Sequence, residues 1–155
     1  MTLPTPFETI YVPADYDGTL DVAQTFEVSN IGPDHPSTLI QTTQDWRIHL
    51  EWTMTGNLVL NLQEEFRVTA FLEDMSPADK DVSNGPIHVP TFSVPASGLS
   101  RQYKLDIPFN AGSVAPGVYE VMVLIQLYET APSNSPWPVA VFAELPPINV
   151  YDPGP

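Results

Sequence analysis

Two histidines and a glutamate are the residues of this chain best suited to metal chemistry. His49 and Glu51 lie two positions apart, so a β-strand through them would place both side chains on one face. Imidazole nitrogens and carboxylate oxygens are common zinc ligands, and a neighbouring strand that brought His88 alongside would complete a three-ligand site. These residues define one functional hypothesis, a metal-dependent enzyme. We favour the simpler interpretation, in which His49 and Glu51 are solvated residues on the polar face of a strand.

An acidic turn is the second candidate metal site. The residues from Asp15 to Gly18 place two carboxylates, those of Asp15 and Asp17, around a glycine, and calcium binds several oxygen ligands at once. In the EF-hand pattern counted from Asp15, Thr19 occupies the third ligand position, and Phe26 stands where a bidentate glutamate belongs. We therefore interpret Asp15 and Asp17 as turn residues, and the sequence predicts no metal and no other cofactor.

Covalent and phosphate chemistry lack the motifs they need. The chain has no cysteine, no Gly-x-Ser-x-Gly motif and no glycine-rich loop of the phosphate-binding kind. The carboxylate pairs Glu64–Glu65 and Glu73–Asp74 consist of adjacent residues, which at the ends of strands usually serve only to solvate those ends. The sequence therefore predicts a protein that is not an enzyme.

Trp137 is a large aromatic residue between two prolines, in a proline-rich stretch from Ala131 to Pro138. An exposed tryptophan can stack on a sugar ring or anchor a protein partner. It supports an alternative function, a carbohydrate-binding β-sandwich module. The interpretation we favour is that the side chain folds back and closes one end of the core.

The charge balance narrows the range of partners. The chain has 19 acidic and 5 basic residues, for a net charge of −14. Such a surface repels phosphate groups, so we expect neither nucleic acid nor an anionic membrane as partner, and a protein partner or a second copy remains. The first residues resemble no signal peptide, and no apolar run approaches the length of a membrane span. The default expectation is a cytoplasmic protein, with an exported particle component as the alternative.

The stretch from Trp46 to Thr55 positions the side chains of His49 and Glu51. Large apolar and polar residues alternate along it, which is the pattern of a strand with one buried and one solvated face. The 18 prolines, against 8 glycines, exclude long helices and mark strand ends and sheet edges. The predicted buried face consists of Trp46, Ile48, Leu50, Trp52 and Met54.

A second strand, from Val118 to Tyr128, is apolar on both faces. One face has the regular core pattern, and the other carries Met122, Leu124 and Tyr128 among polar residues. If the chain's own ends do not cover this second face, it is an exposed apolar surface of the kind that marks an interface, although cover by those ends is the slightly favoured expectation. The candidate interface residues are Phe71, Met122, Leu124, Tyr128 and Trp137.

The remaining strands complete a fold prediction. Eight or nine short strands, separated by turn signals every 8 to 15 residues, indicate an all-β antiparallel sandwich that forms a single domain over residues 1–155. Within it, we expect strands at Phe7–Val12 and Ile87–Val94, a long polar loop at Asp74–Pro86, a continuation of the chain as strand at Leu58–Leu62, and a break at Pro146–Pro147.

Two motifs resemble those of bacterial immunoglobulin-like domains. The segment FEVSNIG, which begins at Phe26, resembles the strand that ends in an Asn-x-Gly turn, and PGVYEVMV, which begins at Pro116, resembles the lead into a late strand. The resemblance implies an immunoglobulin-like β-sandwich. Small β-sandwiches without a catalytic constellation most often serve as binding or structural modules. We therefore expect a non-enzymatic structural or interaction protein that self-assembles, as a homo-oligomer, or joins a larger assembly.

Overall fold

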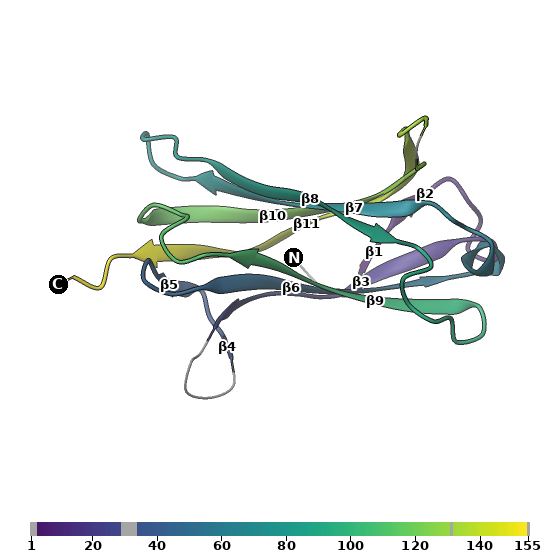
Figure 1. Cartoon of the computed structure of the whole chain (residues 1–155), viewed down its shortest axis with the longest axis horizontal. Helices are drawn as coiled ribbons and strands as arrows, with labels where there is room; N and C mark the ends of the chain where they lie inside the picture. Colours follow the sequence, from purple (N-terminus) through teal and green to yellow (C-terminus); the bar gives the residue numbers. More distant parts are fainter. Residues whose placement is uncertain (1–2, 29–33, 131, 155) are drawn as a thin grey trace.

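Two β-sheets packed face to face make up the fold. The computed structural model describes residues 3–28, 34–130 and 132–154. In these residues the chain forms strands and one short 3-10 helix, Asn57–Leu60, and the strands lie in two layers (Figure 1). This confirms the predicted all-β sandwich. The same residues contain no helix with the length and apolar character needed to cross a membrane.

The first sheet contains three long strands. Their order is β3, β6, β9, and two short strands, β1 and β4, pair with opposite ends of β3. All pairs in this sheet are antiparallel. The bounds are β1 Thr5–Pro6, β3 Asp17–Glu27, β4 His35–Pro36, β6 Trp46–Thr55 and β9 Ser100–Phe109.

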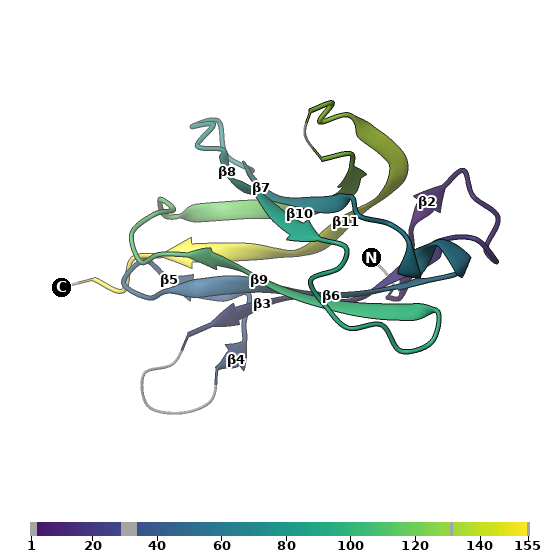
Figure 2. The same cartoon turned by 45° about the vertical axis from the view of Figure 1, so that its right-hand side comes forward.

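The second sheet contains four long strands, in the order β11, β10, β7, β8. Two short strands pair with β11: β2 is antiparallel to it and β5 is parallel, the one departure from the predicted antiparallel pairing among the described strands. The turned view in Figure 2 shows the same two layers. The bounds are β2 Glu8–Thr9, β5 Leu39–Gln41, β7 Glu65–Asp74, β8 Val82–Pro90, β10 Gly117–Tyr128 and β11 Pro136–Tyr151.

The core follows from the alternation of β6. All five of its apolar side chains are buried, as predicted, while the residues between them are at least partly accessible. Trp52 stacks on Tyr103 of β9 with ring centroids 5.3 Å apart, and it meets the edge of Phe66 of β7 at 5.7 Å. Phe66 comes from the opposite sheet, so this aromatic cluster joins the two layers. Burial raises the pKa of Tyr103 to about 12, and its hydroxyl donates a hydrogen bond to the Thr91 carbonyl at 2.6 Å.

Proline is tolerated inside β11 because the strand bulges there. We expected Pro146 and Pro147 to break the strand, but β11 continues through them. The pairing with β10 shifts from Tyr119 opposite Ile148 to Val121 opposite Leu145, so two residues oppose one. A bulge leaves residues out of the hydrogen-bond ladder, which is where a residue without an N–H group fits.

Three other local expectations were wrong. The expected strand at Phe7–Val12 is divided, because β1 joins the first sheet and β2 the second, with Phe7 buried between them. The expected continuation of strand at Leu58–Leu62 is mostly the 3-10 helix. Its entry residue, Gly56, has φ of 121°, and a Cβ there would lie 2.3 Å from the Asp15 carbonyl oxygen, so only glycine fits.

The expected long loop at Asp74–Pro86 is the third. Only Met75–Asp81 separate β7 from β8, because β8 begins at Val82 and runs as an edge strand to Pro90. Its two prolines are tolerated there because an edge strand pairs on one side only.

The aromatic cluster allows a test of the core. Replacing Trp52 by alanine removes a ring that is fully buried between both sheets, so we expect the free energy of unfolding to fall by about 3–5 kcal/mol in urea denaturation. Trp137→Ala, at a partly exposed position, is the matched control and should cost less than half as much. Equal losses from the two substitutions would contradict the assignment of Trp52 to the centre of the core.

Candidate functional site

The candidate site is the outward side of the second sheet. Phe71 of β7 lies opposite Met122 of β10, and Leu124 of β10 lies opposite Phe142 of β11. Directly opposed residues on one face of a sheet have Cβ atoms about 4.5–5.5 Å apart, so these four side chains form one group. We call them the outer apolar face.

This face is accessible in the described structure. Phe142 is 54% exposed and Phe71 36% exposed, while Met122 and Leu124 are partly buried between them. We expected the chain's own ends to cover it, and the described ends do not. The reason is that β11 pairs alongside β10 through its whole length, so it widens the sheet and adds Phe142 to the face instead of lying over it.

Two hollows flank the side chain of Phe142. One, of about 440 Å³, is lined by Phe71, Met122 and Phe142 together with Val82, Ser83 and the loop residue Asp81. The other, of about 550 Å³, lies on the opposite side and is lined by Leu124, Phe142 and the N-terminal residues 5–8. Phe142 therefore forms a ridge between two shallow depressions, a relief into which side chains of a partner can pack.

Hydrogen bonds fix the loop that borders the first hollow. The Asp74 carboxylate accepts the backbone N–H of Ser76 at 2.9 Å and that of Lys80 at 3.0 Å. These two hydrogen bonds stabilise the charged form and lower the pKa of Asp74 below its ordinary value. The Asp81 carboxylate in turn accepts the backbone N–H of Asp74 at 2.8 Å. The loop is thus tied to the end of β7 by its own carboxylates.

The strand positions beside the apolar residues carry negative charge. Glu73 lies opposite Glu120, and Glu144 lies opposite Met122, all three with exposed side chains on the outward side. Arg67, at the other end of β7, points outward too, but its guanidinium binds Glu65 and Asn134. The face therefore has an apolar centre and an acidic end.

Two predicted interface residues lie apart from this apolar centre. The Tyr128 ring is covered by the Arg67 guanidinium, 4.3 Å above it. Trp137 packs against the core at the end of the sandwich, with its ring centroid 6.5 Å from that of Tyr11. Its side chain also helps Ser133 to lower the pKa of Glu129 by hydrogen bonding. This is the position we favoured for Trp137, and it leaves the ring only partly accessible to a sugar.

The proposed histidine site is not assembled. His49 and Glu51 are on β6, whose neighbours are β3 and β9, whereas His88 is on β8 at the edge of the other sheet. The alternative in which a neighbouring strand brings His88 beside His49 therefore does not hold. The His49 ring instead lies between Glu51, at 2.8 Å, and Asp106, at 2.6 Å. No group of three or more metal-binding side chains is found in the residues that the structure describes.

The acidic turn makes local contacts. The Asp17 carboxylate accepts the N–H of Gly18 at 2.8 Å, and the Asp15 carbonyl accepts the N–H of Leu58 at 2.9 Å. Asp21, close behind, accepts hydrogen bonds from the hydroxyls of Thr19 and Thr53, both at 2.7 Å. The carboxylates of Asp17 and Asp21 thus help to shape the start of β3.

Comparison of the chain with family models, with curated proteins and with solved structures finds no match. The argument for function therefore depends on the geometry of this molecule. The residue that sequence reasoning missed is Phe142. The segment Val139–Leu145 is apolar almost throughout, so its pattern does not separate inward from outward positions. The available signal was Glu144, a charged residue two positions after Phe142, because residues two apart on a strand share a face.

The loop beside the first hollow generates a prediction about pH. The pKa of Asp74 is lower in the folded state than in the unfolded chain, so its stabilising effect is present above about pH 4 and is lost as the pH falls through the folded-state pKa. In urea denaturation, Asp74→Asn should therefore be less stable than the wild type at pH 7, and the difference should shrink below pH 4. A difference that is constant from pH 7 to pH 2 would contradict this role.

The neighbouring substitution Glu73→Gln controls for the loss of one charge. It should leave the exchange of the Lys80 amide proton slow, because Asp74 still accepts it. Asp74→Asn should accelerate that exchange at least tenfold, as measured by NMR.

Proposed function

We propose that the protein is a non-enzymatic interaction module that attaches to a protein partner through the outer apolar face. The observation that carries this proposal is the contiguous group of exposed apolar side chains on β7, β10 and β11, with a hollow on each side of Phe142. Contiguous apolar surface with a polar rim marks sites of protein association, because water leaves it at a gain in free energy. An aromatic ridge between depressions also has the form of a binding hot spot.

The charged residues beside the outer apolar face favour one kind of partner over another. Two copies of this face, brought together with the same ends aligned, would oppose the acidic ends formed by Glu73, Glu120 and Glu144, and in any orientation they would join two chains of net charge −14. A partner with lysine or arginine around an apolar centre gains attraction at the same positions. We therefore favour a basic protein surface over a second copy, within the broader proposal of a component of a protein assembly.

We propose further that the sandwich is immunoglobulin-like. The seven long strands divide into three and four, and the chain crosses between the sheets after β6, β8 and β9. A constant-type immunoglobulin domain also has seven strands in two sheets. It differs in its fourth strand, which joins the sheet of the first two strands, whereas β8 joins the sheet of β7, β10 and β11. Tyr119, in the PGVYEVMV segment, supports the proposal: it is buried at the start of β10 and its hydroxyl donates to the Ala115 carbonyl at 2.7 Å. Such a tyrosine corner is a hallmark of that fold.

Site-specific photocrosslinking tests the outer apolar face. A photoreactive phenylalanine analogue at position 142 should give a discrete crosslinked product in cells that produce the protein, and the mass of that product distinguishes another protein from a second copy. The same analogue at position 92, which is a 64% exposed phenylalanine away from the face, is the matched control and should give no such product. Identical patterns at the two positions, or no product at 142, would overturn the proposal.

The crosslinked complex also allows a measurement of affinity. Phe142→Ser should weaken binding of the partner about tenfold or more, since truncating a central aromatic residue typically costs 1–2 kcal/mol or more. Phe92→Ser should change it less than twofold, and both variants should unfold like the wild type. Raising the salt concentration from about 0.05 to about 0.5 M should weaken binding to a basic partner and strengthen self-association, because salt screens attraction and repulsion alike.

A further inference from the structure

The edge of β3 is open along its middle. On one side β3 pairs with β6 from Asp17 to Glu27, with a bulge that leaves Asp21 out of the pairing. On the other side β1 pairs only with Thr19 and Leu20, and β4 only with Phe26 and Glu27. In the described structure, residues 21–25 therefore have no strand beside them on that side. The open length, about five residues, corresponds to about 16 Å.

The backbone groups of this edge are directed outward. The Ser37 N–H donates to the Thr25 carbonyl at 3.0 Å, which shows that the main chain of Thr25 faces away from β6. Residues two apart in a strand present their N–H and C=O groups to the same side, so the groups of Ala23 face the open edge as well. Among the described residues, none is hydrogen-bonded to the outward groups of Ala23. An open ladder of this kind is a template for another strand.

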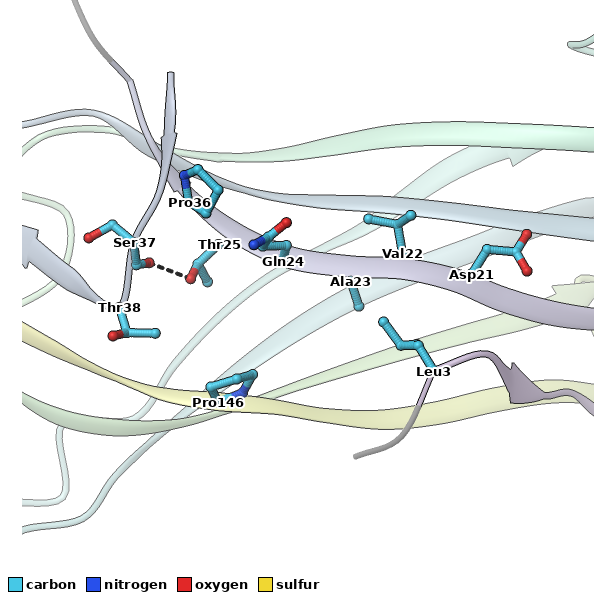
Figure 3. A pocket seen from close by; sticks show the side chains of 10 residues that line it. All are labelled: Leu3, Asp21, Val22, Ala23, Gln24, Thr25, Pro36, Ser37, Thr38 and Pro146. Carbon is cyan, nitrogen blue, oxygen red and sulfur yellow. Dashed lines mark hydrogen bonds between the residues drawn. The ribbon is translucent and has the colours of Figure 1, made fainter. Parts of the chain in front are cut away.

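A pocket of about 480 Å³ lies directly beneath the open edge. The side chains of Ala23 and Leu3 are directed into the space between β3 and β11, and Pro146 of β11 lies on the far side of it (Figure 3). Ala23 is the small residue at the centre of the edge, and its side chain leaves the volume of the pocket unfilled. Asp21 is the one charged residue in the lining, and no lysine or arginine accompanies it.

The edge of β11 that faces β3 is covered only in part. On its outer side β11 pairs with β2 at Val139 and Ala140 and with β5 from Asn149 to Tyr151. Between these two pairings lie Pro146 and Pro147, which have no N–H to offer. Proline, inward-pointing charge and covering strands are the usual means of blocking an edge. Residues 21–25 of β3 contain no proline. The Thr25 carbonyl is bonded to Ser37, and among the described residues the outward backbone groups of Ala23 remain available.

We propose that this open edge binds an extended peptide segment of a partner protein, which adds to β3 as a short strand between β1 and β4. One apolar side chain of the segment occupies the pocket over Ala23, and a lysine or arginine lies beside Asp21. Main-chain hydrogen bonds supply the attachment and the pocket supplies the selectivity, as in other cases of strand addition. Because β1 and β4 close the two ends of the opening, it admits an isolated segment of about five residues and excludes the long edge of a second copy's sheet.

This site is independent of the proposed function. It lies on the edge of the first sheet, whereas the outer apolar face belongs to the second sheet. The two are separable by experiment, because Phe142→Ser alters only the outer apolar face, and substitutions at Ala23 alter only the edge.

A displayed library of random heptapeptides is the probe. Selection on the intact protein should enrich sequences that alternate apolar and polar residues and carry a basic residue near one end. Ala23→Phe, which fills the pocket, should weaken binding of these peptides at least tenfold, and Phe142→Ser should leave it within twofold. The control Gln102→Phe introduces the same ring at an exposed position of β9, away from the pocket, and should change binding less than threefold.

Two measurements keep the test decisive if Ala23→Phe fails to fold. Synthetic copies of an enriched peptide, each with one backbone nitrogen methylated, should lose at least tenfold in affinity when the methyl group removes an N–H directed at β3. In the wild-type protein, NMR should show the Ala23 amide exchanging quickly alone and at least tenfold more slowly with the peptide. Failure to enrich any sequence, equal binding to Ala23→Phe, or insensitivity to methylation at every position would each overturn the proposal.

Discussion

The packing of aromatic rings between the two sheets is the interaction on which the rest of the structure depends. Trp52 and Tyr103 from the first sheet and Phe66 from the second have ring centroids 5.2 to 5.7 Å apart, at the centre of one continuous core. Once these residues are turned inward, the two-residue period of each strand decides which neighbours are turned outward. The register that builds the core therefore also turns the outer apolar face away from it, and the described residues leave that face exposed.

The acidic composition of the chain and the placement of its carboxylates both favour a basic protein surface as the proposed partner. The chain is strongly acidic, and at one end of the outer apolar face Glu73, Glu120 and Glu144 stand beside apolar side chains. Burial of an apolar centre contributes to the affinity for a partner. Charges of one sign around that centre favour partners of the opposite charge and speed their association. The proposed peptide site at the edge of β3 would add a second mode of attachment, through the main chain, on the other sheet. With both proposed sites, the protein would have two separate contact regions, as a component of an assembly would need.

The sequence predicts the fold better than it predicts the site, for a physical reason. Alternation in Trp46–Thr55 identifies a strand and its buried face without any knowledge of neighbours, and it was correct at every apolar position. Which strands are neighbours depends on pairing between distant segments, so the sequence left open a site that joins His88 to His49, although the two lie in different sheets. The same limit hid Phe142, which meets Leu124 only through the pairing of β10 and β11. Local backbone details, such as the bulge at Pro146 and Pro147, likewise depend on what the partner strand provides.

The most direct measurement of the central claim is the native mass of the protein isolated from the cells that make it, before and after Phe142→Ser. The monomer has a mass of 17.1 kDa. A binding role for the outer apolar face predicts a larger complex for the wild type and a mass near that of the monomer for the variant, with both proteins folded. A wild-type protein that is monomeric at its native concentration, or a complex that survives Phe142→Ser unchanged, would contradict it.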